Sequence, residues 1–396
     1  MAVTTSNQQP PASADGERTS ADGNGRGPAT ATDAPRSFRP YEPITDRAEI
    51  RWWTGAVTLA AFAAMFLAVI ALVKAHNPSP AKAGTTSAAP ASSGAAAASS
   101  VDFDATPGAG FHARDPNAPA PLPGTVHNID MHIKEVVLEV APGVKQMMWT
   151  FDGQVPGPIY RGHVGDTFNF KITNDGTMTH SLDFHAGMVS PNTAMVPIEP
   201  GHSHTYTFRA NHAGIFMYHC GTPPVLQHIG SGMYGALIID PPGLPPVAHE
   251  YVLVQSELYT GANGDVPDYN KLLSGNYDAV MFNGYVNQYK FAPIHVAPGD
   301  RVRVWVMDDG PSDSSSFHVI GTIFDTVYKE GAYLLQPGPG QGGSQALDLA
   351  PAQGGFVEFT PSEPGSYTFV THKFNDAVRG ALGVFHVGDA APMSHS

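Results

Sequence analysis

The sequence predicts an all-β protein made of two tandem Greek-key β-sandwich domains, preceded by a disordered tail and one transmembrane helix. Of the 396 residues, 42 are glycine and 36 are proline, while only 14% are charged. That composition favours many short strands joined by turns over long charged helices. Beyond residue 124, apolar and polar residues alternate in several segments, and similar segments recur in the same order about 135 residues apart, as in a duplicated domain.

The chain opens with a polar segment and then an apolar one. Residues 1–50 are rich in Ser, Thr, Gly, Pro and Ala, which predicts a disordered tail. Within 51–75, the 22 residues from Trp52 to Val73 carry no charge, enough for a helix that crosses a bilayer. Arginines dominate before this segment, which places the tail in the cytoplasm. We therefore expect a single-pass protein of the cell membrane with its folded domains on the extracytoplasmic side.

The alternative for this apolar segment is a cleaved signal peptide, with "AKA" at 81–83 as the cleavage site. The polar leader is long for a signal peptide, and the apolar run exceeds the roughly 7–15 residues of a signal core. A retained anchor therefore fits better, although the sequence leaves cleavage open. Residues 76–124 are rich in Ala, Ser and Pro, which predicts a flexible linker.

Two related segments mark the two domains. "VGDTFNFKITNDG" at 164–176 and "PGDRVRVWVMDDG" at 298–310 both read as half-buried strands with turn residues on either side. Each is followed within ten residues by a histidine, and each half later has a glycine-led aromatic strand that runs into another histidine. The predicted boundaries are 125–242 for the first domain, 243–388 for the second and 389–396 for a C-terminal tail.

Charge and cysteine content exclude several classes of protein. The net charge of −14 argues against nucleic acid as a partner. A single cysteine rules out an intrachain disulfide and hence a disulfide-stabilised secreted scaffold. The 18 histidines are more than average composition supplies, so we expect some of them to bind metal.

The only cysteine, Cys220, stands in a pattern typical of a copper site. His228 follows it by eight residues and Met233 follows His228 by five, all between two predicted strands. Copper in electron-transfer sites favours two imidazoles, one thiolate and a weak thioether. His180, from a neighbouring strand region, is the candidate for the second imidazole. The opposing interpretation, a buried thiol beside an unrelated histidine and methionine, does not account for this spacing.

A second set of ligands follows from the alternation of side chains in extended backbone. If Cys220 faces a metal inside its own sandwich, the adjacent His219 faces away from it. His185 lies an odd number of residues from His180, which also reverses the face. His185 and His219 should therefore meet on the outer surface and need a third ligand from elsewhere. Three histidines with an open position suit catalysis better than storage.

These motifs resemble those of the copper-containing nitrite reductases, which have two cupredoxin domains, over roughly residues 125–388. "HSLDFH" and "YHCGTPPVLQHIGSGM" are similar to the family's two ligand segments in the first domain. "SSFHVIGTIFDTVY" and "FVTHKF" are similar to its second-domain segments. The resemblance implies type I copper on His180, Cys220, His228 and Met233, type II copper on His185, His219 and His372, catalytic roles for Asp183 and His318, and a pocket lined by Ile320.

The resemblance also implies the activity and its partners. Nitrite would be reduced to nitric oxide, with electrons entering at type I copper and passing through Cys220 and His219 to type II copper. One copper of each type per subunit and a homotrimer are expected, with His372 and His318 reaching a site built mostly by the neighbouring subunit. Asp183 and His318 would supply protons through a bridging water. The chain has no CxxCH haem motif, so a separate small cupredoxin or cytochrome c is the expected electron donor.

Three other functions compete with this interpretation. A two-domain multicopper oxidase of the laccase type would need about eight histidines, typically in His-X-His-like pairs with one pair flanking the cysteine. Here Cys220 is followed by Gly221, and the second domain offers only His318 and His372 in the right places. A membrane-tethered electron carrier or copper-binding module would use the first site and leave the second without catalysis. A zinc hydrolase on the three histidines would leave the Cys–His junction without a purpose. The physiological role, respiratory denitrification or detoxification, and any oxygen side activity stay open.

Overall fold

The computed structural model describes residues 99–389. The predicted tail (1–50), transmembrane helix (51–75), the first part of the linker and the end of the C-terminal tail lie outside the described residues. Contacts divide the chain into Met1–Pro90 and Ala91–Ser396, and the described residues all belong to the second unit. Among residues 99–389, no helix has the length and apolar character that a membrane crossing requires.

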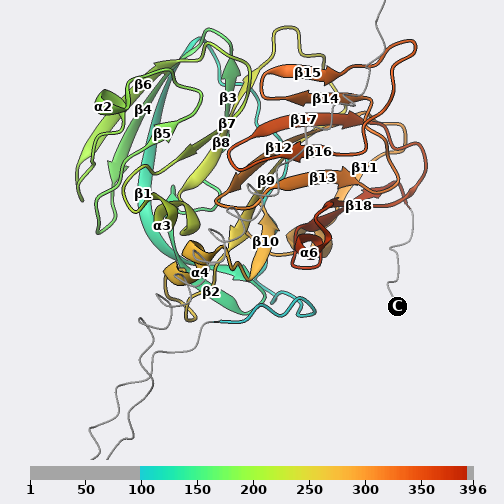
Figure 1. The fold of residues 1–396 in the computed structure, drawn as a ribbon. Coiled ribbons are helices and arrows are strands. Elements are labelled where there is room, and N and C mark those ends of the chain that lie inside the picture. Colours follow the sequence, from blue (N-terminus) through green and yellow to red (C-terminus); the bar gives the residue numbers. More distant parts are fainter. Residues whose placement is uncertain (1–98, 390–396) are drawn as a thin grey trace, which may run out of the picture. The chain divides into compact units, whose positions relative to one another are not determined.

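The described chain is mostly β, as the composition predicts, and its first half forms two four-stranded sheets (Figure 1). The sheet orders are β2-β1-β4-β6 and β3-β8-β7-β5. Non-consecutive strands lie side by side, as where the first strand pairs in parallel with the fourth. The strands are β1 (Val126–Ala141), β2 (Val144–Phe151), β3 (Tyr160–His163), β4 (Thr167–Asn174), β5 (Asp183–Phe184), β6 (Ser203–Arg209), β7 (Gly214–His219) and β8 (Tyr234–Asp240).

The second half forms a six-stranded and a five-stranded sheet. Their orders are β10-β9-β12-β17-β14-β15 and β11-β19-β18-β13-β16. The strands are β9 (His249–Leu258), β10 (Ala279–Phe282), β11 (Ile294–Val296), β12 (Val302–Gly310), β13 (Ser315–Val319), β14 (Thr326–Lys329), β15 (Ala332–Leu335), β16 (Leu347–Leu349), β17 (Gly354–Phe359), β18 (Gly365–Thr371) and β19 (Leu382–Val387).

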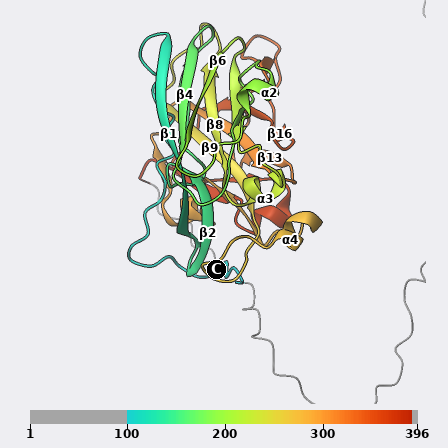
Figure 2. The same ribbon diagram turned by 90° about the vertical axis from the view of Figure 1, so that its left-hand side faces the viewer.

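The described helices are short and lie in the connections between strands. α3 (Val225–Gly230) lies between β7 and β8, and α6 (Phe374–Ala377) follows β18. The others are α2 (Pro191–Ala194), α4 (Tyr269–Ser274) and α5 (Gln288–Phe291). Figure 2 views the first half of the chain from its outer side, where β1, β4 and β6 run together.

Burial along two strands shows how the alternating pattern is used. In β4, Phe168, Phe170 and Ile172 are fully buried while Lys171 is exposed, as predicted for a half-buried strand. In β12 all nine residues are buried, so the prediction of a half-buried strand there was wrong. The valines of β12 face the core of its own sandwich, whereas Trp305 and Met307 pack against β7 of the first sandwich. The contact between β12 and β7 joins distant parts of the chain, so the alternation of apolar and polar residues within β12 does not reveal it.

A buried network of charges joins the two halves. Arg161 on β3 donates to Asp240 (2.8 Å) and to Glu250 on β9 (2.8 Å). Arg303 on β12, with a side chain 1% exposed, pairs with Glu250 (3.1 Å) and Glu358. Since each carboxylate faces an arginine, the charges compensate one another inside the protein.

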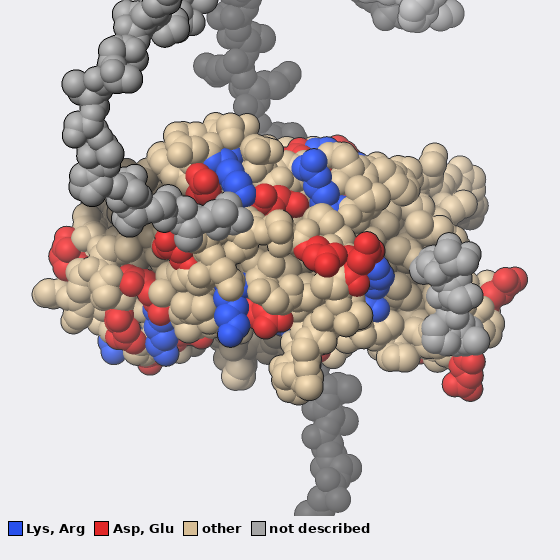
Figure 3. Space-filling view, turned by 90° about the horizontal axis from the view of Figure 1, so that it is seen from below, with Lys and Arg blue, Asp and Glu red and all other residues tan. Residues whose placement is uncertain are grey.

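Surface charges are sparse. On the face in Figure 3, acidic and basic side chains are interspersed among wide uncharged areas. Exposed pairs such as Lys171 and Asp130, 3.4 Å apart, are screened by solvent and typically contribute about 0–1 kcal/mol. Burial of apolar side chains in the packed interiors therefore stabilises the fold more than surface ion pairs do.

Replacing Arg303 by Met should strongly destabilise the protein, because it removes a buried cation and leaves Glu250 with Arg161 alone and Glu358 with Arg301 alone. The expected loss in the free energy of unfolding is about 3–5 kcal/mol, measured by urea titration of the metal-free protein. The matched control, Lys171→Met, removes an exposed ion pair and should change it by less than about 1 kcal/mol. Equal effects of the two substitutions would contradict the assigned role of the network.

Candidate metal centres

The first candidate centre is a buried cluster of His180, Cys220 and His228. The Cys220 Sγ lies 3.2 Å from Nδ1 of His228 and 3.8 Å from Nδ1 of His180. The two Nδ1 atoms are 3.2 Å apart. Donor atoms at these separations can all reach one ion at the roughly 2.0–2.3 Å typical of imidazole and thiolate ligands.

The connection between β7 and β8 supplies most of this centre. Cys220 follows the last residue of β7, α3 carries His228, and Met233 directly precedes β8. The Cys220 amide donates to the Met233 carbonyl (3.1 Å), which closes the loop at its base. His180 comes from the loop after β4 and is held by an isolated bridge to Ile198. The loop from β7 to β8 and the loop after β4 thus bring their side chains together inside the first sandwich.

Burial changes the protonation of the side chains in the first cluster in a way that favours cation binding. It lowers the pKa of both His180 and His228 to about 4, so both imidazoles are neutral near pH 7 and can offer a lone pair. Burial also raises the pKa of the Cys220 thiol. A bound cation reverses that effect because it stabilises the thiolate.

The donors of the first cluster fit copper. All three are nitrogen or sulfur atoms, and no carboxylate belongs to the cluster. Met233 is fully buried in the same apolar cluster as Cys220, which places a thioether in the same interior. Two imidazoles, a thiolate and a methionine form the ligand set that copper electron-transfer sites favour.

The second candidate centre consists of Asp183, His185 and His219. The Nε2 atoms of the two histidines are 3.1 Å apart, and Oδ2 of Asp183 lies 3.9 Å from each of them. Asp183 and His219 are directly paired between β5 and β7. The His219 side chain is 12% exposed, against about a third for the other two side chains, so this cluster opens to the surface.

The backbone determines which nitrogen of His219 is free. Its Nδ1 lies 2.9 Å from the carbonyl oxygen of Cys220. A carbonyl only accepts hydrogen bonds, so Nδ1 must carry the proton and Nε2 keeps the lone pair. That lone pair faces His185, as a shared metal requires. His219 and Cys220 therefore serve different clusters on opposite sides of one peptide bond, as the alternation predicts.

The second-domain candidates form a separate group. His318 on β13 and His372 at the end of β18 have ring centroids 5.5 Å apart. Neither belongs to the cluster of His185 and His219. Ile320, 46% exposed, directly follows β13 and lines an apolar groove of about 800 Å³ that also includes Phe374 and Val378. The structure thus places two imidazoles beside an exposed apolar surface.

Two contacts of these centres were not predicted from the sequence. The ring of Trp149 packs edge-on against His228, with centroids 4.8 Å apart, and shields the first centre. The carbonyl of Gln345 lies 2.5 Å from Nδ1 of His318, which fixes the proton on that nitrogen and leaves Nε2 free. Both partners lie far along the chain from the residue they contact, and no local motif marks them.

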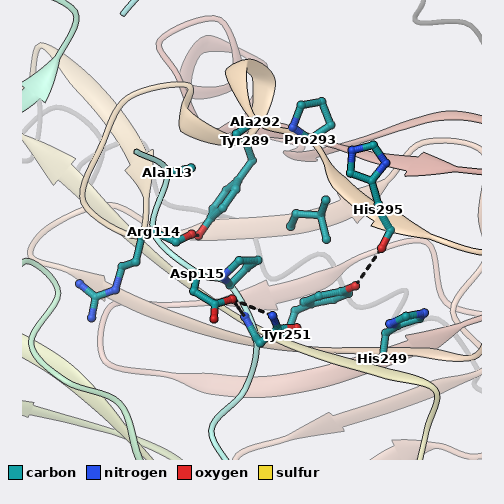
Figure 4. Close-up of a pocket in the computed structure, with 12 residues that line it drawn as sticks. Ala113, Arg114, Asp115, His249, Tyr251, Tyr289, Ala292, Pro293 and His295 are labelled. Carbon is teal, nitrogen blue, oxygen red and sulfur yellow. Dashed lines mark hydrogen bonds between the residues drawn. The ribbon is translucent and has the colours of Figure 1, made fainter. Parts of the chain in front are cut away.

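A cavity of about 390 Å³ elsewhere, lined by Tyr251, His249 and His295, lacks such a convergence of ligands (Figure 4). Tyr251 donates to the backbone carbonyl of His295, and His249 pairs with Asp300 at 2.9 Å. The Tyr251 hydroxyl and the His249 ring are thus each bonded to a separate partner. Within residues 99–389, neither of the two clusters of metal-ligating side chains lies at this cavity.

Comparisons with known proteins agree with the two clusters. A family model described as multicopper oxidase matches residues 132–243. The copper-containing nitrite reductase of Neisseria meningitidis is 38% identical over 274 residues, which cover 66% of this chain and 69% of that protein. The enzyme of Alcaligenes xylosoxydans xylosoxydans is 30% identical over 60% of this chain and 78% of that protein.

The structural comparison gives the same result. The copper nitrite reductase of Nitrosomonas europaea superimposes with a TM-score of 0.61 and 32% identity, covering 67% of this chain and 95% of that chain. The similarity thus extends over the sequence, the fold and the segments that carry both clusters. The chain belongs to the family of copper-containing nitrite reductases.

Proposed function

We propose that this chain reduces nitrite to nitric oxide with two coppers per subunit, type I in the buried cluster and type II at the surface cluster. The observation that carries the proposal is the direct adjacency of Cys220 and His219, one in each cluster. Bound there, copper would exchange single electrons at the thiolate centre and act as a Lewis acid toward nitrite at the imidazole centre.

The chain supplies a short route for the electron. The covalent path runs from the Cys220 side chain through the backbone to the His219 ring. A second path uses the hydrogen bond from His219 Nδ1 to the Cys220 carbonyl, 2.9 Å long. Both paths lie within a single dipeptide, so the two centres stay at a constant separation while side chains elsewhere move.

Protons are the second requirement. Nitrite, one electron and two protons give nitric oxide and water, so acids must stand at the surface cluster. Asp183 is suited to this role, because its carboxylate lies 3.9 Å from both imidazole nitrogens and is about a third exposed. His318, whose Nε2 is left free by the bond to Gln345, is the proposed second proton carrier.

The third ligand and His318 would come from a neighbouring chain in a homotrimer. His372 is exposed and stands apart from His185 and His219 in its own chain. Next to it lies the groove lined by Ile320, Phe374 and Val378, an apolar surface of the kind that protein interfaces cover. Joining this face to the surface cluster of another copy would complete three imidazoles with an open position.

The location and the electron donor extend the same proposal. The uncharged 22-residue segment from Trp52 to Val73 would anchor the enzyme, with its catalytic domains outside the cytoplasm. No haem motif occurs in the sequence, so a separate small cupredoxin or cytochrome c would deliver electrons to the buried centre.

The competing functions fit the geometry less well. A simple electron carrier has no use for Asp183, His185 and His219 gathered at the surface within 4.8 Å of one another. A laccase-type oxidase needs a trinuclear centre with many more imidazoles, whereas residues 99–389 contain two clusters with two histidines each. A zinc hydrolase would not need Cys220.

Cys220→Ser should remove the type I copper and its thiolate absorption in the visible range, because a serine oxygen is a poor ligand for that centre. The surface cluster should keep its copper. We expect turnover with an external donor to be abolished, measured as nitric oxide production, while metal analysis shows one copper per chain instead of two. Turnover at the wild-type rate would disprove the route through Cys220.

Asp183→Asn should lower nitrite turnover by about 10²-fold or more, since the amide cannot deliver a proton. The visible absorption of the type I centre should not change, because Asp183 does not touch that cluster. Asp175→Asn is a matched control, since it alters an exposed carboxylate paired with His132 instead. Unchanged nitrite reduction in the Asp183 variant would exclude this residue from proton delivery.

Co-expression of a His372→Ala chain with a His185→Ala chain tests the shared centre. A homotrimer made of either variant alone has no complete type II centre, because every centre misses one histidine. Each mixed trimer has one intact interface and should recover about one third of the wild-type rate, measured on doubly tagged oligomers. No recovery in mixed oligomers would show that the centre is not built from two chains.

A further inference from the structure

We propose that Tyr277, Asp313, Lys373 and Asp376 form a positioning cluster that holds His372 in register with His318 and thereby sets the copper affinity of the surface centre. This inference rests on the proposed function, because it assigns His372 to that centre. We call these four residues the Lys373 cluster. None of them belongs to either candidate metal centre.

Tyr277 is the bridge of the Lys373 cluster. Its hydroxyl lies 2.6 Å from Oδ2 of Asp313 and 2.6 Å from Oδ1 of Asp376. The guanidinium of Arg379 covers its ring at 5.4 Å, and Asn375 donates to the same oxygen of Asp376 (2.9 Å). The phenol thus sits between two carboxylates from distant parts of the chain.

Lys373 supplies the cation between the same two carboxylates. Its ammonium pairs with Oδ1 of Asp313 and lies 3.4 Å from Oδ2 of Asp376. Asp376 is fully buried, and its Oδ2 has no hydrogen-bond partner. The Lys373 ammonium therefore balances the negative charge of this carboxylate oxygen. Without it, a charged oxygen would be buried with no partner, which destabilises the folded state.

The Lys373 cluster connects the two segments that carry the second-domain histidines. Asp313 lies in the turn between β12 and β13, and β13 carries His318. Lys373 is the next residue after His372 in the sequence. Asp376 lies in α6, the helix that begins directly after Lys373. The His372 amide donates to the Ser316 carbonyl at 2.6 Å, so backbone contacts continue the connection made by the side chains.

This arrangement constrains the backbone on both sides of His372. On one side β18 is paired with β13, and on the other side Lys373 and Asp376 are fixed to Asp313 and Tyr277. An exposed imidazole that must meet two ligands of another chain gains from such preorganisation. Groups that orient a metal ligand typically change metal affinity by about 10–100-fold when they are replaced.

The test uses the full-length protein, freed of metal and titrated with copper(II) alone. Electron paramagnetic resonance separates thiolate-bound copper from copper held by imidazoles only. In Lys373→Met we expect copper to bind the surface centre at least about 10-fold more weakly and with an altered signal, while the thiolate-bound copper is unchanged. Lys373→Arg should restore most of the affinity. Lys329→Met, which removes a lysine paired with Asp348 at 2.9 Å, is the matched control and should behave as wild type.

Tyr277→Phe provides a second variant if Lys373→Met does not fold, because it removes a single hydroxyl and should weaken the surface copper in the same direction. Wild-type copper affinity and signal in both variants would overturn the inference. A wild-type protein that takes up only the thiolate-bound copper would instead refute the proposed function. The two failures are therefore distinguishable.

Discussion

The peptide bond between His219 and Cys220 is the constraint on which both candidate centres depend. In extended backbone, neighbouring side chains point to opposite faces, so the thiol enters the first sandwich while the imidazole faces the surface. The hydrogen bond from His219 Nδ1 to the Cys220 carbonyl adds a second restraint and leaves Nε2 free for a metal. Any shift of β7 would therefore disturb both centres together.

The two centres are built in different ways from the same strand. The buried centre is complete within one chain, since the connection from β7 to β8 carries Cys220, His228 and Met233, and the loop after β4 brings His180. The surface centre has two imidazoles and a carboxylate, and the side chains of Asp183 and His185 are about a third exposed. A closed site suits electron storage and transfer, whereas an incomplete one suits binding of a substrate.

Spacing in the sequence was enough to predict the residues that local geometry brings together. The separation of Cys220 from His228 and Met233 matches one loop, and the reversal of faces places His185 beside His219. The buried second face of β12, the Gln345 carbonyl at His318 and the Lys373 cluster could not be predicted, because each depends on contacts between distant segments. The membrane segment and the trimer stay predictions, since the described residues of one chain test neither.

Reduction of nitrite by the fully copper-loaded protein tests the central claim most directly. The protein is loaded, reduced chemically and given nitrite, with nitric oxide detected and copper counted per chain in the same sample. The account predicts two coppers of unlike spectroscopic type per chain and formation of nitric oxide by an oligomer. A protein that is monomeric, or that holds one copper when saturated and forms no nitric oxide, would contradict it.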